Sequence, residues 1–124
     1  MLVEDEGNIL DALMRLFRRE GYQLIRATSA EEGVKLLETT SVDIVISDQR
    51  MPGMQGTEFL KEVKSRYPNS IRMILSGYAQ TDEIDEALDT GVISLFIPKP
   101  VNEEDLRRTV RLALLQRGNS DPNP

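Results

Sequence analysis

The strongest constraint on the fold is the run Ile44-Val45-Ile46, which leads directly into Ser47 and Asp48. A short β-branched run without alternating polar residues is typical of a strand that is buried on both faces, as in a parallel sheet. Successive parallel strands need a long crossover connection, and this is usually a helix. The run therefore predicts a parallel sheet covered by helices.

Amphipathic helical segments alternate with short apolar segments along the rest of the chain. The spacing of Ile9, Leu13 and Leu16 predicts a helix over residues 8–20. Ser29, followed three residues later by Glu32, forms a capping box that begins a second helix, and Asn102 caps the last one. The other helices are expected near residues 57–67 and 81–90, and the strands at residues 1–3, 22–28, 42–48, 71–75 and 94–97.

Five strands that are each followed by a helix indicate an α/β fold, a (βα)5 doubly wound open parallel sheet of the flavodoxin-like kind. We expect the strand order 2-1-3-4-5. Residues 1–117 are predicted to form one domain, and residues 118–124 a frayed tail or the start of a linker to an effector domain. Only three residues precede Glu4, which is short for a central strand, so we expect the chain to be clipped at its start.

The composition excludes several classes of function. The chain has no Cys and no His, which removes disulfides, thiolate chemistry, Ser-His-Asp triads and His-based zinc sites. Its formal charge of −6 argues against nucleic acid as a direct partner. No apolar run is long enough to cross a membrane and no signal-peptide pattern opens the chain, so the predicted location is the cytoplasm.

Polar residues follow four of the five predicted strands. Glu4 and Asp5 come after the first, Asp48 after the third, Ser76 after the fourth and Lys99 after the fifth. Open α/β sheets bind ligands at the carboxyl ends of their strands. Neighbouring strands lie about 4.8 Å apart, so the first and third strands bring three carboxylates together. Such a cluster must be protonated, paired or bound to a cation.

These side chains offer only oxygen ligands, which favours Mg²⁺, with Mn²⁺ as the alternative. Lys99 would add a positive charge, leaving the site near neutral once a divalent ion is bound. A metal, an ammonium, the Ser76 hydroxyl and a central carboxylate suit phosphoryl transfer, with Asp48 attacking in line. Each residue alone is explained more simply as a loop, cap or turn residue. Their joint occurrence at four strand ends favours a site.

The chain resembles the receiver domain of two-component response regulators from Leu2 to about Gln116. Each motif alone is weak, but the four in this order are specific. They are Glu4-Asp5-Glu6; residues 43–48 followed by Met51-Pro52-Gly53-Met54 and Gly56; Ile74-Leu75-Ser76-Gly77; and Pro98-Lys99-Pro100.

The resemblance implies that Asp48 accepts a phosphoryl group from the phospho-histidine of a partner histidine kinase or phosphotransfer protein. Asp5 and Asp48, with the backbone carbonyl of Arg50, would hold Mg²⁺, and Glu4 would help through water. Lys99 would contact the phosphoryl group. The domain would catalyse only its own phosphorylation and dephosphorylation, and it would control a covalently linked effector domain.

The resemblance also implies a conformational switch. The Ser76 hydroxyl would turn towards the phosphoryl group and pull the following loop inward, which frees space for an aromatic side chain on the fifth strand. By position this side chain is Phe96, and we expect it to favour the inward rotamer because it lacks a hydroxyl; ordinary core packing is the alternative.

The fourth helix, fifth strand and fifth helix would form the output surface. Two copies could pair through this face, where the last helix carries Arg107, Arg108 and Arg111 opposite an acidic neighbouring helix. A solvated face explains the arginines equally well. Arg50 and Tyr78 occupy positions that modulate acyl-phosphate hydrolysis in this family, and a shielding Arg50 predicts slow self-dephosphorylation.

Three other functions compete with this interpretation. A phosphatase of the haloacid-dehalogenase kind needs a second Asp two residues after the nucleophile, where this chain has Arg50. A flavodoxin-like or nucleotide-binding module needs a Gly-rich phosphate loop after the first strand, where Glu4-Asp5-Glu6 would repel phosphate. A pseudo-receiver that is never phosphorylated stays open, because all of the site residues are present.

Overall fold

The computed structural model describes residues 1–77 and 81–119. The strands form one parallel sheet in the order β2-β1-β3-β4-β5, which confirms the predicted (βα)5 fold. The elements in chain order are β1 (Leu2–Val3), α1 (Gly7–Arg18), β2 (Arg26–Ala27), α2 (Ala30–Leu37), β3 (Ile44–Asp48), α3 (Gly56–Arg66), β4 (Ile71–Ser76), α4 (Asp82–Asp89), β5 (Leu95–Pro98) and α5 (Glu103–Asn119).

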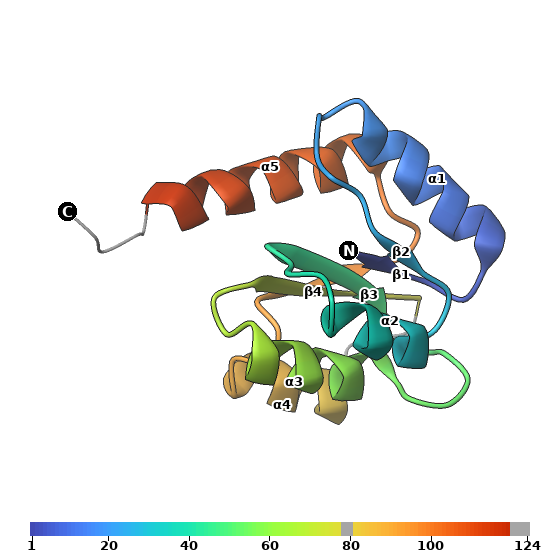
Figure 1. Ribbon diagram of the computed structural model, residues 1–124, viewed down its shortest axis with the longest axis vertical. Coiled ribbons are helices and arrows are strands. Elements are labelled where there is room, and N and C mark those ends of the chain that lie inside the picture. Colours follow the sequence, from blue (N-terminus) through green and yellow to red (C-terminus); the bar gives the residue numbers. More distant parts are fainter. Residues whose placement is uncertain (78–80, 120–124) are drawn as a thin grey trace.

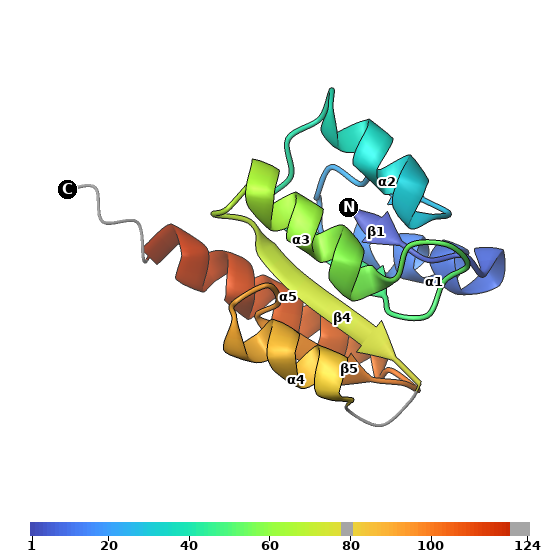
Figure 2. The same ribbon diagram turned by 90° about the horizontal axis from the view of Figure 1, so that it is seen from below.

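Helices cover both faces of the sheet. Helices α1 and α5 lie on one face and α2, α3 and α4 on the other (Figure 1), and Figure 2 shows the second group in front of the sheet. Each layer buries its own apolar cluster. Leu10, Phe17 and Leu106 belong to the α1–α5 side, and Phe59 and Ile84 to the opposite side. The sheet is therefore buried on both faces, as the β-branched run of β3 predicted.

The second strand is shorter than the sequence indicated. Residues 22–28 were expected to form it, but only Arg26 and Ala27 pair with β1. Strand β1 itself contains only Leu2 and Val3, and a ladder cannot be longer than its shorter strand. The shortness of β1 thus accounts for the wrong prediction.

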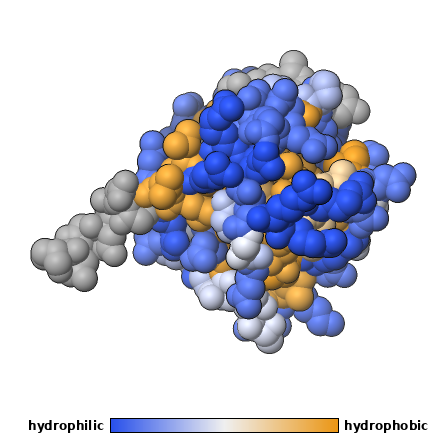
Figure 3. All heavy atoms as spheres, turned by 90° about the horizontal axis from the view of Figure 1, so that it is seen from above, coloured by the Kyte–Doolittle hydropathy of each residue, from blue (hydrophilic) through white to orange (hydrophobic). Residues whose placement is uncertain are grey.

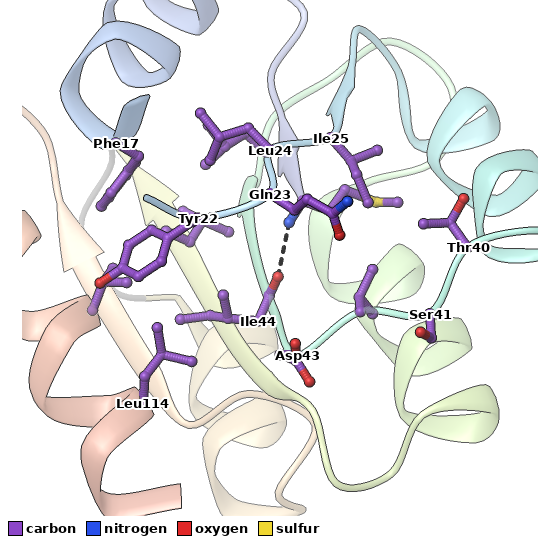
Figure 4. A pocket seen from close by; sticks show the side chains of 15 residues that line it. Phe17, Tyr22, Gln23, Leu24, Ile25, Thr40, Ser41, Asp43, Ile44 and Leu114 are labelled. Atoms are coloured by element: carbon purple, nitrogen blue, oxygen red, sulfur yellow. Dashed lines mark hydrogen bonds between the residues drawn. The ribbon is translucent and has the colours of Figure 1, made fainter. Parts of the chain in front are cut away.

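The amino end of β1 lies beside a cavity. The amino group of Met1 donates a hydrogen bond to the Ile44 carbonyl oxygen at 2.9 Å. A cavity of about 320 Å³ opens between residues 22–25 and the start of β3, with Leu24, Ile25 and Asp43 in its wall (Figure 4). None of the predicted site residues lines this cavity, because it lies at the amino ends of the strands.

Side-chain caps begin two helices as predicted. The Ser29 hydroxyl accepts a hydrogen bond from the Glu32 amide at 3.0 Å, while the Glu32 carboxylate accepts from the Thr28 amide at 2.8 Å. Before α5, the Asn102 side-chain oxygen accepts from the Asp105 amide at 3.0 Å. These bonds satisfy amide groups that the first turn of a helix leaves without a backbone partner.

Helix α5 continues to Asn119 and so includes the first two residues of the predicted tail. Residues 120–124 of that tail lie outside the described residues. Within the described part of the chain, no helix combines the length and the apolar character needed to cross a membrane.

A buried arginine joins two loops at the amino ends of β4 and β5. Arg72 of β4 is only 6% exposed. Its guanidinium donates at 2.7 Å to the Val92 carbonyl and at 2.9 Å to both the carbonyl and the hydroxyl of Ser70. Burial lowers the pKa of this guanidinium. Three further carbonyl acceptors lie at 3.1–3.4 Å, those of Gly91, Tyr67 and Pro68.

Candidate functional site

Three acidic side chains meet at the carboxyl ends of β1 and β3. Glu4 and Asp5 follow β1, Asp48 ends β3, and the two strands are neighbours in the sheet. One carboxylate oxygen from each residue lies within 4.8 Å of the others. Glu4 and Asp48 are buried, whereas Asp5 is exposed. The structure thus brings together the acids that the strand-end argument predicted.

Lys99 lies between two of these carboxylates. Its ammonium is 3.1 Å from Glu4 Oε1 and 3.0 Å from Asp48 Oδ1. The backbone positions it, because the Lys99 amide donates to the Ser76 carbonyl at 2.8 Å just beyond the end of β5. With three carboxylates ionised and one ammonium, the formal charge of the site is −2.

The pKa values of two groups show how strongly the site favours added positive charge. Burial, followed by repulsion from Asp48, raises the pKa of Glu4 to about 7. Burial alone would lower the pKa of Lys99, but its hydrogen bonds to Asp48 and Glu4 outweigh burial and raise the pKa above its ordinary value. Two carboxylates about 4.8 Å apart repel by roughly 3 kcal/mol at an effective dielectric constant near 20. A bound cation would relieve this repulsion.

The residues present fit a divalent metal ion. All three side chains supply carboxylate oxygens, which are the ligands that Mg²⁺ prefers, and a divalent charge would neutralise the formal charge of −2. Among residues 1–77 and 81–119, this is the one group of three acidic side chains close enough to share an ion. Arg50, whose backbone carbonyl was predicted to complete the ligand set, follows Asp48 by two residues and has an exposed side chain.

The predicted switch residues lie on the two strands that follow β3. Ser76 is the last residue of β4 and is 2% exposed. Its neighbour Leu75 pairs with Asp48, so Ser76 lies one residue beyond the position opposite the acceptor. Phe96 of β5 is half-buried and packs against the apolar cluster on the α4 side. Tyr78, the other predicted modulator, lies outside the described residues.

The sequence analysis missed the tight approach of α3 to the site. Gly56 is the first residue of α3, and a Cβ atom there would lie 2.3 Å from the Asp48 carbonyl oxygen and 2.8 Å from Ile74 Cδ1. Only glycine lets the helix begin at this distance from the acceptor strand. The sequence analysis named Gly56 only as part of a motif and predicted the helix to begin near residue 57, whereas α3 begins at Gly56.

Gln49, directly after Asp48, was also missed. Its side chain is 4% exposed, and its Oε1 accepts a hydrogen bond from the Thr57 amide at 2.8 Å. It therefore supplies the side-chain cap that Gln55, the residue before α3, does not make. No local pattern marks such a cap, because Gln49 and Thr57 are separated by the intervening loop.

Comparison with known proteins identifies the chain. The family model for the response regulator receiver domain matches residues 1–111. The chain belongs to this family. The hydrogenase transcriptional regulatory protein HoxA of Cupriavidus necator is 37% identical over 118 residues, which cover 95% of this chain and 24% of HoxA. The receiver domain thus spans about a quarter of the length of that relative.

Solved receiver domains agree with the fold. A CheY-like receiver domain protein from Methanospirillum hungatei has a TM-score of 0.89 and 29% identity, covering 95% of this chain and 94% of that one. The response regulator TrrA from Thermotoga maritima, solved in complex with Mg²⁺ and BeF, has a TM-score of 0.76 and 27% identity, covering 89% and 93%. The domain is thus a receiver of two-component signal transduction.

Proposed function

We propose that Asp48 is the phosphoacceptor of this receiver domain and that its donor is the phospho-histidine of a histidine kinase or phosphotransfer protein. An Asp48 oxygen attacks phosphorus as the phosphorus–nitrogen bond of the donor breaks, and the leaving imidazole takes up a proton. The observation that carries the proposal is the Lys99 ammonium, 3.0 Å from Asp48 Oδ1. It orients the carboxylate and offers positive charge to the incoming phosphoryl oxygens.

The acidic cluster would hold Mg²⁺, or Mn²⁺ in its place, through Asp5, Asp48 and the backbone carbonyl of Arg50. Glu4 would take part through water, because its Oε1 already bonds to Lys99 and its Oε2 accepts from the Glu6 amide at 3.3 Å. A bound divalent ion supplies positive charge that offsets the phosphoryl oxygens. In this role the domain catalyses only its own phosphorylation and dephosphorylation.

Phosphorylation would then change the shape of the α4–β5–α5 face. The modification replaces a carboxylate of charge −1 with an acyl phosphate near −2 that has new acceptor oxygens. The hydroxyl of Ser76 would bond to one of them and draw the start of the β4–α4 loop inward, and Phe96 would turn into the space released. This movement would carry the signal to a covalently linked effector domain, and the cytoplasm is the proposed location. The length of HoxA, about four times the matched region, supports a linked domain.

The same face could join two copies of the domain, with Leu95 of β5, 36% exposed, at the contact. Charge pairing between acidic α4 and basic α5 would contribute less than the sequence suggests. Arg107 and Arg108 already pair with Glu104 and Asp105 of their own helix. The third arginine of that strip, Arg111, pairs with Glu20 at 2.6 Å.

The donor protein would dock on the face formed by α1 and α5, where apolar atoms lie between charged side chains (Figure 3). A cavity of about 580 Å³ on this side has Lys99 in its wall beside Ile9, Leu13 and Val101. Arg15 and Arg19 of α1 border an adjoining hollow, opposite Glu103 and the paired Arg107 of α5. Positive charge around an apolar floor suits an acidic amphipathic helix.

Incubation with Mg²⁺ and acetyl phosphate tests the proposal. Intact-mass measurement should show a labile gain of one phosphoryl group that is lost in Asp48→Asn. A wild-type protein that never gains the group, at any Mg²⁺ concentration, would make the chain a pseudo-receiver. Hydrolysis of phosphate monoesters over many turnovers would instead support a phosphatase, because a receiver takes its phosphoryl group only from an activated donor.

A further inference from the structure

The side chain of Gln49 connects the phosphoacceptor strand to α4. Its Nε2 lies 3.3 Å from the hydroxyl of Thr57 at the start of α3 and 3.4 Å from Glu83 Oε2 in the first turn of α4. A third acceptor, Gln55 Oε1, lies at 3.3 Å. The Gln49 side chain is buried, whereas Glu83 is exposed, so the bond between them joins the interior to the surface of α4.

The backbone of Gln49 holds this side chain in place. The Gln49 amide donates to the Leu75 carbonyl of β4 at 3.1 Å, and the Gln49 carbonyl accepts from the Gly56 amide at 3.0 Å. The residue directly after Asp48 is therefore fixed to β4 on one side and to α3 on the other. A displacement of Asp48 or of the loop after β4 acts directly on this residue.

Glu83 lies on the element that the proposed switch would move. Helix α4 begins at Asp82, and the loop that leads to it starts at Ser76. The bond from the Gln49 amide to the Glu83 carboxylate is assisted by charge, which strengthens it relative to a neutral bond. The first turn of α4 is thus tied to the residue next to the phosphoacceptor.

We propose that Gln49 is a positioning residue that latches α4 in its unphosphorylated position. The proposal rests on the proposed function of Asp48 and names how that site is regulated. When Ser76 moves towards a phosphoryl group, the loop displaces the first turn of α4 and the bond to Glu83 breaks. Because the latch exists only in the resting conformer, its loss raises the population of the switched conformer.

Hydrogen exchange of α4 in the unphosphorylated chain of 124 residues tests the latch. Glu83→Ala should speed the exchange of the α4 amides by about fivefold, the effect of one lost hydrogen bond. Gln49→Met, which also removes the bonds to Thr57 and Gln55 of α3 and its preceding loop, should speed it by at least as much. The double variant should exchange no faster than Gln49→Met alone, since that variant has already lost the bond to Glu83. Glu83→Gln keeps an acceptor oxygen and should restore protection. Glu86→Ala is the matched control, because Glu86 lines the same α3–α4 groove but lies one turn further along.

A second measurement separates a latch from a merely structural contact. The apparent affinity for beryllium fluoride, added with Mg²⁺ as a phosphoryl mimic, should rise by the same factor in Gln49→Met and Glu83→Ala. Unchanged exchange and affinity in Glu83→Ala, a substitution at an exposed position that leaves the core intact, would overturn the latch. Phosphorylation of Asp48 by acetyl phosphate is measured separately in the wild type. If the wild type is phosphorylated but the variants change neither exchange nor affinity, the latch is refuted and the proposed function of Asp48 is not.

Discussion

Replacing Arg72 with Met tests whether a buried guanidinium that bonds mainly to backbone carbonyls stabilises the domain. Met has a similar length and retains the apolar contacts of the side-chain stem, but it removes every donor. The Val92 and Ser70 carbonyls, at 2.7 and 2.9 Å, would lose a charged donor in a buried setting. Tyr67 keeps another partner, because its carbonyl also accepts from the Ser70 amide at 3.0 Å.

The expected loss of stability follows from the two shortest bonds to carbonyl oxygens, those of Val92 and Ser70. Each hydrogen bond to a charged donor contributes about 1.5–3 kcal/mol, which gives about 3–6 kcal/mol for the pair. Met also avoids the cost of burying the guanidinium, which offsets part of this sum. We therefore expect the free energy of unfolding to fall by about 3 kcal/mol. At a urea m-value of about 1.5 kcal/mol/M, the midpoint would shift by about 2 M.

Urea unfolding followed by circular dichroism measures this change. Arg66→Met is the matched control: Arg66 is an exposed arginine of α3 that pairs with Glu62 at 3.5 Å, so its loss should cost no more than about 0.5 kcal/mol. The free energy of unfolding of Arg72→Lys should lie between those of the wild type and Arg72→Met, because one ammonium cannot reach both loops. The reasoning is refuted if the free energies of unfolding of Arg72→Met and Arg66→Met differ by less than about 0.5 kcal/mol. That result would mean that the lost hydrogen bonds are fully offset by no longer burying a charge.

Three further predictions concern the site itself. Without metal, the free energy of unfolding should fall as pH rises from about 4.5 to about 7, because the folded state holds a proton on Glu4 that the unfolded state has released. Urea titrations in EDTA at several pH values measure this fall, which should be smaller in Glu4→Gln. An equal fall in that variant would exclude Glu4 as the cause. Gly56→Ala should lower the free energy of unfolding by about 1–3 kcal/mol, since its Cβ atom would lie 2.3 Å from the Asp48 carbonyl oxygen. The midpoint of thermal unfolding measures this loss. A midpoint equal to that of the wild type would mean that the start of α3 can shift to make room. Phosphorylated Arg50→Asn should lose its phosphoryl group faster than the wild type when intact mass is followed over time, and an equal or slower loss would contradict the shielding role of Arg50.

The meeting of acids and lysine at one edge could be predicted because it depends only on topology. Once Ile44-Val45-Ile46 indicates a parallel sheet, all strands run in the same direction, so their carboxyl ends lie at the same edge. Asp48 and Lys99 then come together, although 50 residues separate them. The length of β2 was predicted wrongly, because the pattern of residues 22–28 carries no information about the shortness of its partner strand.

The sequence alone determined the fold class and the set of side chains at the strand ends, because hydrophobic periodicity locates the strands and helices. The strand order was an expectation that the structure confirms. Only the tertiary structure decided which acid is buried. Glu4 is enclosed and paired with Lys99, while Asp5 is exposed at the rim. It also decided the partners of Gln49 and Arg72, whose bonds reach 34 and 20 residues along the chain. Such contacts depend on side-chain directions within a packed interior, and these exist only once the layers have come together.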